Sequence, residues 1–224
     1  MSKKPIKKSD KEKDWWLGKR KNRRIKSQLE YHFIICEGTK TEPNYFKAIK
    51  AKITAKNREK ITIQVIGKRR GTTNLLEEAI KEVQKSPNYI SNVWLIYDKD
   101  EFSEESFNEV VEKCNEINKQ DNTLYRPMWS NESIEVWILL HFIRFDTPMG
   151  RKECIQKINE NFRQKNLGTY QKNDENLYQK LTPYVAIAIQ NAKWLDAKYT
   201  SELPAKRNPC TKVYELVELL HKYI

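Results

Sequence analysis

The sequence predicts an α/β protein in which a mostly parallel sheet is flanked by helices and followed by a helical C-terminal extension. Before Gly150, short apolar runs rich in β-branched and aromatic residues alternate with amphipathic stretches. Alternation of this kind is typical of parallel strands that are covered by helices. Acidic residues directly follow two of the apolar runs, and from Gly150 onward the pattern is mostly helical.

Length and composition predict one domain with a sizeable core and a strongly solvated surface, because 38% of the 224 residues are hydrophobic and 32% are charged. We divide the chain into a basic arm at 1–28, a core at 29–148 and a mostly helical part at 149–224 that packs on the core. No apolar run approaches the roughly 20 residues that span a bilayer, and the N-terminus is too basic for a signal peptide. We therefore expect a cytoplasmic protein that binds no membrane, with its four cysteines reduced.

Four strands are predicted from the apolar runs. Each run is short, is bounded by turn-forming residues and contains the residue types that strands favour. The predicted strands are Tyr31–Cys36, Ile61–Ile66, Val93–Tyr97 and Leu124–Trp129.

Helices are predicted between and after these strands from apolar residues at helical spacing. Pro43 suits the first turn of the helix after the first strand, Thr72 or Thr73 suits the cap of the next helix, and a third runs from Ser103 to Asn118. Ser130 or Asn131 is predicted to cap the helix that follows the fourth strand. The C-terminal helices are expected at Arg151–Lys165, Asn176–Leu181, Pro183–Lys198 and Pro209–Tyr223.

Acidic side chains follow two of the predicted strands where each strand ends. Glu37 comes directly after the first strand, and Asp98 and Asp100 come after the third. The carboxyl ends of parallel strands share one edge of a sheet, where ligand sites of open sheets lie. Carboxylate oxygens suit Mg²⁺ or Mn²⁺, and such an ion promotes hydrolysis of phosphate esters. Glu37 could be a ligand or a general acid or base. Two aspartates one residue apart are often a solvated turn, but their position after a buried strand favours a metal site.

These segments resemble a known family. IICEGTKTE and WLIYDKDE resemble the Toprim fold of topoisomerases, primases and overcoming-lysogenization-defect nucleases. CEGTKTEPNYF, YDKDEF, SNESIEVWILLHF and NPCTKVYELV more closely resemble the RloB-like family, from about Phe33 to the chain end. That family usually has Pro where this chain has Glu132, a departure that leaves Glu135 in register.

The resemblance implies a Toprim-like catalytic core at 29–148 and a nuclease that depends on Mg²⁺ or Mn²⁺. The substrate would be RNA such as tRNA, or DNA, and the role would be bacterial defence against phage by abortive infection, with defence proteins or further copies of the chain as possible partners. The resemblance also implies that Glu135 is a further metal ligand and that Lys206 stabilises the transition-state phosphate. The alternatives are that Glu135 only complements the helix dipole and that Lys206 is solvated. The implied catalytic set is Glu37, Asp98, Asp100, Glu135 and Lys206, of which the first four are the implied metal ligands.

The net charge of +12 indicates a polyanionic partner such as nucleic acid. Twelve basic and three acidic residues lie in the first 28 positions, a density that fits an arm binding phosphates. A solubilising tail is an equally good reading of the composition. The candidate nucleic-acid contacts are Lys19, Arg20, Lys21, Arg23 and Arg24 in the arm, Lys68, Arg69 and Arg70 after the second strand, and Arg207 near the C-terminus.

Two other functions compete with the nuclease. The first is a non-hydrolytic effector module whose metal site binds nucleic acid or a nucleotide, since fold does not fix function. The second is a receiver-like phosphoacceptor domain, which the Glu-Gly turn after the first strand suits poorly. No region resembles a tyrosine-nucleophile or zinc-binding domain, which disfavours a topoisomerase or a primase. His32 and His141 lie in apolar segments and are interpreted as structural.

Overall fold

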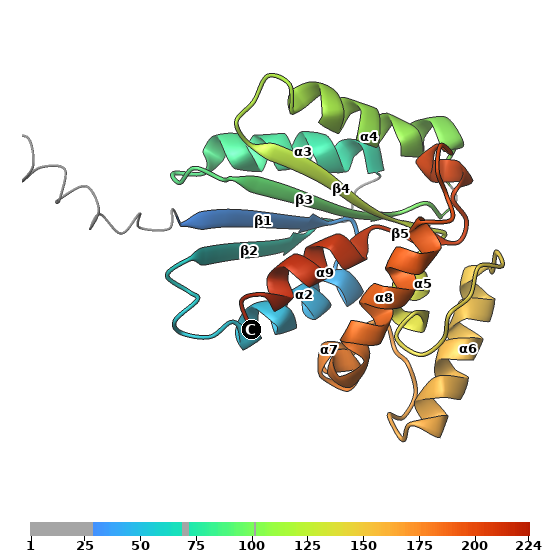
Figure 1. Cartoon of the computed structure of the whole chain (residues 1–224). Coiled ribbons are helices and arrows are strands. Elements are labelled where there is room, and N and C mark those ends of the chain that lie inside the picture. Colours follow the sequence, from blue (N-terminus) through green and yellow to red (C-terminus); the bar gives the residue numbers. More distant parts are fainter. Residues whose placement is uncertain (1–28, 69–71, 101) are drawn as a thin grey trace, which may run out of the picture.

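The computed structural model describes residues 29–68, 72–100 and 102–224. Within these residues the strands form one five-stranded sheet in the order β2-β1-β3-β4-β5 (Figure 1). β1 (Glu30–Cys36), β2 (Ile61–Gly67), β3 (Asn92–Asp98) and β4 (Leu124–Asn131) are parallel, and β5 (Cys210–Thr211) is antiparallel to β4. The predicted α/β class with a mostly parallel sheet is confirmed, and the arrangement is consistent with a Toprim-like fold.

Two helices cover one face of the sheet, α3 (Thr72–Lys85) and α4 (Glu104–Ile117) (Figure 1). Because strand side chains alternate between faces, Phe33 and Ile35 of β1 point to this side and pack with Phe107 and Val110 of α4. A hydrophobic cluster of buried residues therefore fixes α4 against the sheet whose strands β1 and β3 end at Glu37 and Asp98.

The opposite face is covered by α2 (Thr41–Lys52) and α9 (Val213–His221), and the other C-terminal helices pack beside them, with α6 (Arg151–Gln164) beyond the end of the sheet (Figure 1). Ile34 and Cys36 of β1 share this second cluster with Trp137 and Leu216. The C-terminal helices are α5 (Glu135–Leu139), α6 (Arg151–Gln164), α7 (Leu177–Leu181) and α8 (Val185–Asp196), with a 3-10 turn at Thr182–Tyr184 before α8. One hydrophobic core thus joins the sheet to the C-terminal part.

The fourth strand is longer than the sequence predicts, and the predicted cap is wrong. Ser130 and Asn131 belong to β4, where the Ser130 hydroxyl lies 3.0 Å from the Thr211 hydroxyl and Asn131 Nδ2 donates to the Ala205 carbonyl at 3.0 Å. α5 begins only at Glu135, with Ile134 at its N-cap position and no side-chain cap. Contacts with a distant segment therefore override the capping pattern.

The last predicted helix is shorter than expected at its start. Cys210 and Thr211 pair with the end of β4, so α9 starts at Val213, whose N–H donates to Thr211 Oγ1 at 3.2 Å. A strand of two residues has no periodic signature, which is why the sequence alone does not reveal it. Within the described part of the chain, no helix has both the length and the apolar character to cross a bilayer.

Candidate active site

The ends of β1 and β3 bring Glu37 and Asp98 together because these two strands are neighbours in the sheet. The Glu37 N–H donates to the Ile96 carbonyl at 2.9 Å, and the Asp98 N–H lies 3.5 Å from Glu37 Oε2. Glu37, Asp98 and Asp100 line one cavity of about 530 Å³. The structure therefore places the three acidic residues of the two predicted strand ends in one pocket, which we call the acidic pocket.

The loop after β3 holds Asp100 in an uncommon backbone conformation. Its φ of 37° lies in the left-handed region, which Asp adopts more readily than most residues. The N–H of Lys99 donates to the Ser130 carbonyl at 2.9 Å, and that of Asp100 donates to the Glu132 carbonyl at 3.0 Å. The end of β4 thus fixes the backbone that presents the second aspartate.

Two further carboxylates line the acidic pocket, Glu42 and Glu135. Glu42 lies in the first turn of α2, where a carboxylate also favours helix formation. Glu135 is the first residue of α5 and is fully buried. Tyr170 donates a hydrogen bond from its hydroxyl to Glu135 Oε1 at 3.2 Å, and Lys172 Nζ lies 3.5 Å from the same oxygen.

Arg151, the first residue of α6, joins carboxylates from three elements. Its Nη2 lies 3.2 Å from Asp98 Oδ2 and 2.5 Å from Asp100 Oδ1, and its Nε lies 3.3 Å from Glu135 Oε2. A guanidinium presents five donors in a planar fork, which suits this bridging. The acidic pocket is thus held together by a cation that comes from the C-terminal part.

Burial and neighbouring carboxylates make Glu37 and Asp98 hard to ionise. Burial raises the pKa of Glu37 from 4.5 to about 7, and the charges of Asp100 and Glu42 add to this effect. Burial followed by the charges of Glu42, Glu135 and Asp100 raises the pKa of Asp98 well above its usual 3.8. Burial alone would lower the pKa of Arg151, but the carboxylates of Glu135 and Asp100 more than offset this, so its pKa is raised. The pocket therefore carries more carboxyl groups than its own cations neutralise.

The donor set suits a hard divalent cation in chemistry and charge. Five carboxylate residues line the acidic pocket against the three cations Lys40, Arg151 and Lys172, and oxygen ligands are those that Mg²⁺ and Mn²⁺ prefer. Among the residues that the structure describes, however, no three His, Cys, Asp or Glu side chains stand in a geometry that would hold a metal ion. The reason is visible in the contacts, since Asp98, Asp100 and Glu135 face the guanidinium of Arg151.

Comparison with known proteins identifies the family of this fold and pocket. The family model described as RloB-like protein matches residues 32–220, which is most of the chain. The chain belongs to the RloB-like family. No curated protein and no solved structure matches the chain. Membership of the RloB-like family indicates a nuclease-related function, and the match excludes the basic arm at 1–28, as the sequence resemblance does.

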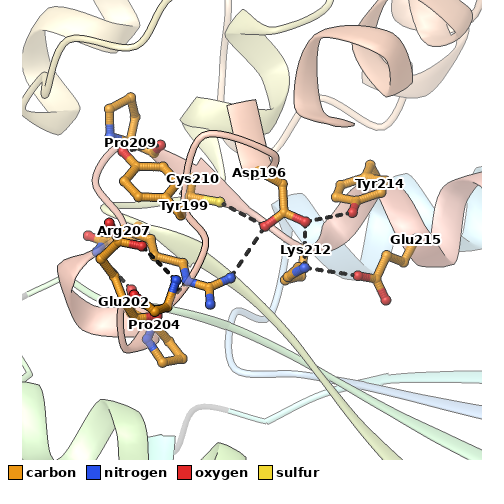
Figure 2. Close-up of polar contacts among 12 residues, drawn as sticks. Asp196, Tyr199, Glu202, Pro204, Arg207, Pro209, Cys210, Lys212, Tyr214 and Glu215 are labelled. Atoms are coloured by element: carbon orange, nitrogen blue, oxygen red, sulfur yellow. Dashed lines mark hydrogen bonds and ion pairs between the residues drawn. The ribbon is translucent and has the colours of Figure 1, made fainter. Parts of the chain in front are cut away.

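Lys206 and Arg207 of this RloB-like chain do not line the acidic pocket. Lys206, at the end of a 3-10 turn (Pro204–Lys206), pairs with Glu104 at 2.6 Å. Arg207 Nε donates to the Glu202 carbonyl at 2.7 Å, and Nη1 lies 3.5 Å from Asp196 Oδ1. Figure 2 shows Asp196 at the centre of this network, where Lys212, Tyr214 and Cys210 also reach its carboxylate. In this structure both predicted contacts are engaged in protein contacts around the C-terminal loop.

The other predicted nucleic-acid contacts lie elsewhere or outside the described residues. Lys68 follows β2 and lies 3.6 Å from Glu78 and 3.5 Å from Glu82 on α3. The remaining predicted contacts, Lys19, Arg20, Lys21, Arg23, Arg24, Arg69 and Arg70, lie outside the described residues.

Both histidines that the sequence assigns to structure have structural contacts. His32 Nδ1 accepts a hydrogen bond from Trp94 Nε1 at 2.9 Å, while its Nε2 lies 3.0 Å from Glu30. His141 Nδ1 bonds to the Trp137 carbonyl at 3.0 Å. Neither histidine lines the acidic pocket.

Sequence reasoning did not place Glu42, Arg151, Tyr170 or Lys172 at the site. Glu42 could have been found from its place in the segment EGTKTE, because a strand end, a tight turn and a helix start keep Glu37 and Glu42 close. Arg151 and the two residues of the 166–176 segment carry no local signal, since they reach the pocket only through tertiary packing.

Proposed function

We propose that this RloB-like chain is a Mg²⁺- or Mn²⁺-dependent nuclease that hydrolyses phosphodiester bonds in RNA such as tRNA, or in DNA, and acts in anti-phage defence by abortive infection. The observation that carries the proposal is the convergence of acidic residues from the ends of β1 and β3 and the start of α5 on one cavity. Family membership supports the nuclease class. The metal, the substrate and the defence role are the proposed parts.

The carboxylates of the acidic pocket would have two roles, metal binding and proton transfer. Asp98, Asp100 and Glu135 are the residues that would hold the divalent cation. When bound there, the cation supplies positive charge against the phosphoryl oxygen and promotes formation of the hydroxide nucleophile. Glu37, with a pKa of about 7, exchanges a proton readily near neutral pH, which suits a general acid or base.

Two lysines line the acidic pocket and suit contact with substrate phosphates, Lys40 and Lys172. Lys172 is half exposed and lies beside the buried Glu135. A lysine in this position can stabilise charge that develops on a phosphate. It therefore competes for the role that the sequence resemblance carries onto Lys206, and alanine variants of the two lysines compare them directly.

The test is cleavage by the purified protein with plasmid, single-stranded DNA or total tRNA, each with Mg²⁺, Mn²⁺ or a chelator. We expect metal-dependent product from at least one substrate. Asp98→Asn is expected to abolish it because it removes a charged oxygen ligand. Asp146→Asn is the matched control, since Asp146 is exposed and pairs with Lys198 outside the pocket. Cleavage that survives a chelator, or an Asp98 variant with full activity, would contradict the proposal.

A non-hydrolytic effector module is the second candidate, favoured by the raised pKa of Asp98 and by the pairing of Arg151 with Asp98, Asp100 and Glu135, the three carboxylates that would hold the metal. Reversible binding of nucleic acid or nucleotide without product under every condition would support it. Loss of product with retained binding in Asp98→Asn would instead support the nuclease.

A further inference from the structure

Arg151 takes the place that a metal ion would need in the acidic pocket. Its guanidinium contacts Asp98, Asp100 and Glu135 at 2.5–3.3 Å, and these side chains come from β3, the loop after it and α5. A divalent ion held by the same three carboxylates would lie close to the guanidinium, and the two positive charges would repel each other. Binding of a divalent ion to these residues therefore favours an arrangement in which the guanidinium of Arg151 has moved away.

A second cavity lies beside the acidic pocket and offers the displaced side chain a destination. This adjoining cavity has a volume of about 700 Å³ and is lined by Glu37, Asp100, Phe102, Glu132, Gly150, Arg151 and Lys152. Glu37, Asp100 and Arg151 line both cavities, so the guanidinium stands at their boundary. Nothing lies within 4 Å of where a Cβ of Gly150 would be, which leaves open space at the start of α6.

We propose that Arg151 is an exchangeable counter-cation. It neutralises the carboxylates of the acidic pocket until a divalent cation binds, and its guanidinium then turns into the adjoining cavity and holds a phosphate of the substrate. This inference rests on the proposed metal-dependent nuclease. The planar fork of Arg binds phosphate in the same bidentate manner as carboxylate, so one side chain suits both partners.

Physical considerations support the exchange. The Arg151 side chain is 31% exposed, so part of it already faces the solvent beside the two cavities. A cation on the carboxylates repels the positive guanidinium at close range, and this repulsion falls as the side chain turns away. Competition also lowers the apparent affinity for the metal by the fraction of molecules in which Arg151 occupies the site.

The first test is calorimetric titration of Mn²⁺ into the metal-free full chain, as wild type, Arg151→Gln and Arg163→Gln. We expect Arg151→Gln to bind Mn²⁺ at least tenfold more tightly than wild type, because its competitor is gone. Arg163→Gln is the matched control, since it makes the same substitution on α6 at an exposed side chain that lines neither cavity. We expect its affinity to equal that of wild type. Circular dichroism verifies the fold of each variant.

The second test measures the NMR signal of the Arg151 side chain in the wild-type protein and needs no variant. Two-dimensional NMR follows the Nε–H signal of Arg151 while Mg²⁺ and then inorganic phosphate are added. We expect Mg²⁺ to move this signal and phosphate to move it again, whereas phosphate without Mg²⁺ leaves it in place.

The outcomes separate the inference from the proposed function. If none of the three proteins binds Mn²⁺, the metal-dependent nuclease fails and the inference fails with it. If all bind Mn²⁺ with equal affinity, or if Mg²⁺ does not move the Arg151 signal, the exchange is wrong while the nuclease stands. A phosphate shift that needs no Mg²⁺ overturns the transfer of Arg151 to the substrate.

Discussion

Acidification is expected to destabilise the fold through His141, which ends the segment that carries Glu135. His141 is fully buried, and its Nδ1 must be the donor to the Trp137 carbonyl because a carbonyl only accepts. Among the described residues, no group within hydrogen-bond distance partners Nε2. Protonation would place an N–H and a charge there without a partner. Burial therefore lowers the pKa of His141 from 6.5 to about 4.

The sign and size of the effect follow from this pKa. Between about pH 4 and 6.5 the unfolded chain binds a proton at this position that the folded chain does not, so stability falls as the pH falls. A shift from 6.5 to about 4 corresponds to a loss of about 2 to 3 kcal/mol between pH 7 and pH 4.5, at about 1.4 kcal/mol for each pKa unit. The raised pKa of Glu37 acts in the opposite direction, because its contribution to the stability of the fold is lost as the pH rises towards 7.

Urea unfolding of wild type and His141→Asn at several pH values isolates the contribution of the histidine. The amide of Asn can donate to the Trp137 carbonyl but does not titrate, and other titrating groups cancel in the comparison. We expect the stability difference between the two proteins to shift by about 2 to 3 kcal/mol against wild type on acidification from pH 7 to pH 4.5. Parallel stability curves for the two proteins would refute the reasoning.

Three further predictions concern the scaffold. Gly67→Ala should lower the free energy of unfolding by about 1 to 3 kcal/mol, since a Cβ there would lie 2.6 Å from the Gly38 carbonyl oxygen. Gly150→Ala, with nothing within 4 Å of the added Cβ, should be nearly neutral. Equal losses of stability for the two variants in thermal unfolding would contradict this. Asn118→Ala should cost about 1 to 3 kcal/mol and promote association, because Asn118 pairs with the backbone N–H and carbonyl of Tyr125 on β4; an unchanged melting point would argue against it. All four cysteines are buried with raised pKa values, so alkylation by iodoacetamide should be slow until urea unfolds the chain, and rapid labelling of the native protein would contradict this.

The elements that the sequence predicts correctly are those whose pattern is local. The apolar runs before Glu37 and Asp98 define two strands, and parallel geometry then places the residues at their ends side by side. Glu135 was predicted from the family resemblance and not from the pattern of residues around it. Glu37, Asp98, Asp100 and Glu135 were therefore accessible from the sequence, whereas Glu42 was not placed at the site.

Arg151 and Lys172 were not accessible, because their places in the pocket depend on packing between segments that are far apart in the chain. Arg151 reads as an ordinary helix start, and Lys172 lies in a segment without periodicity. The prediction that Ser130 caps a helix was wrong for the same reason. A polar residue between an apolar run and a helix has the pattern of a cap, and only the distant contact with Thr211 shows that it belongs to the strand. Local patterns identify the groups that need a counter-charge but not the residue that supplies it.

The acidic pocket gathers residues from Glu37 to Lys172, so a nascent chain cannot assemble it early. Asp98 and Asp100 are synthesised well before Arg151 and before Lys172, which contacts Glu135. The last strand of the sheet, β5, is synthesised only near the C-terminus. A polypeptide that has not yet reached Lys172 therefore lacks the complete set of pocket residues. During translation the acids are present for a time without Arg151 and Lys172, which pair with them in the finished protein.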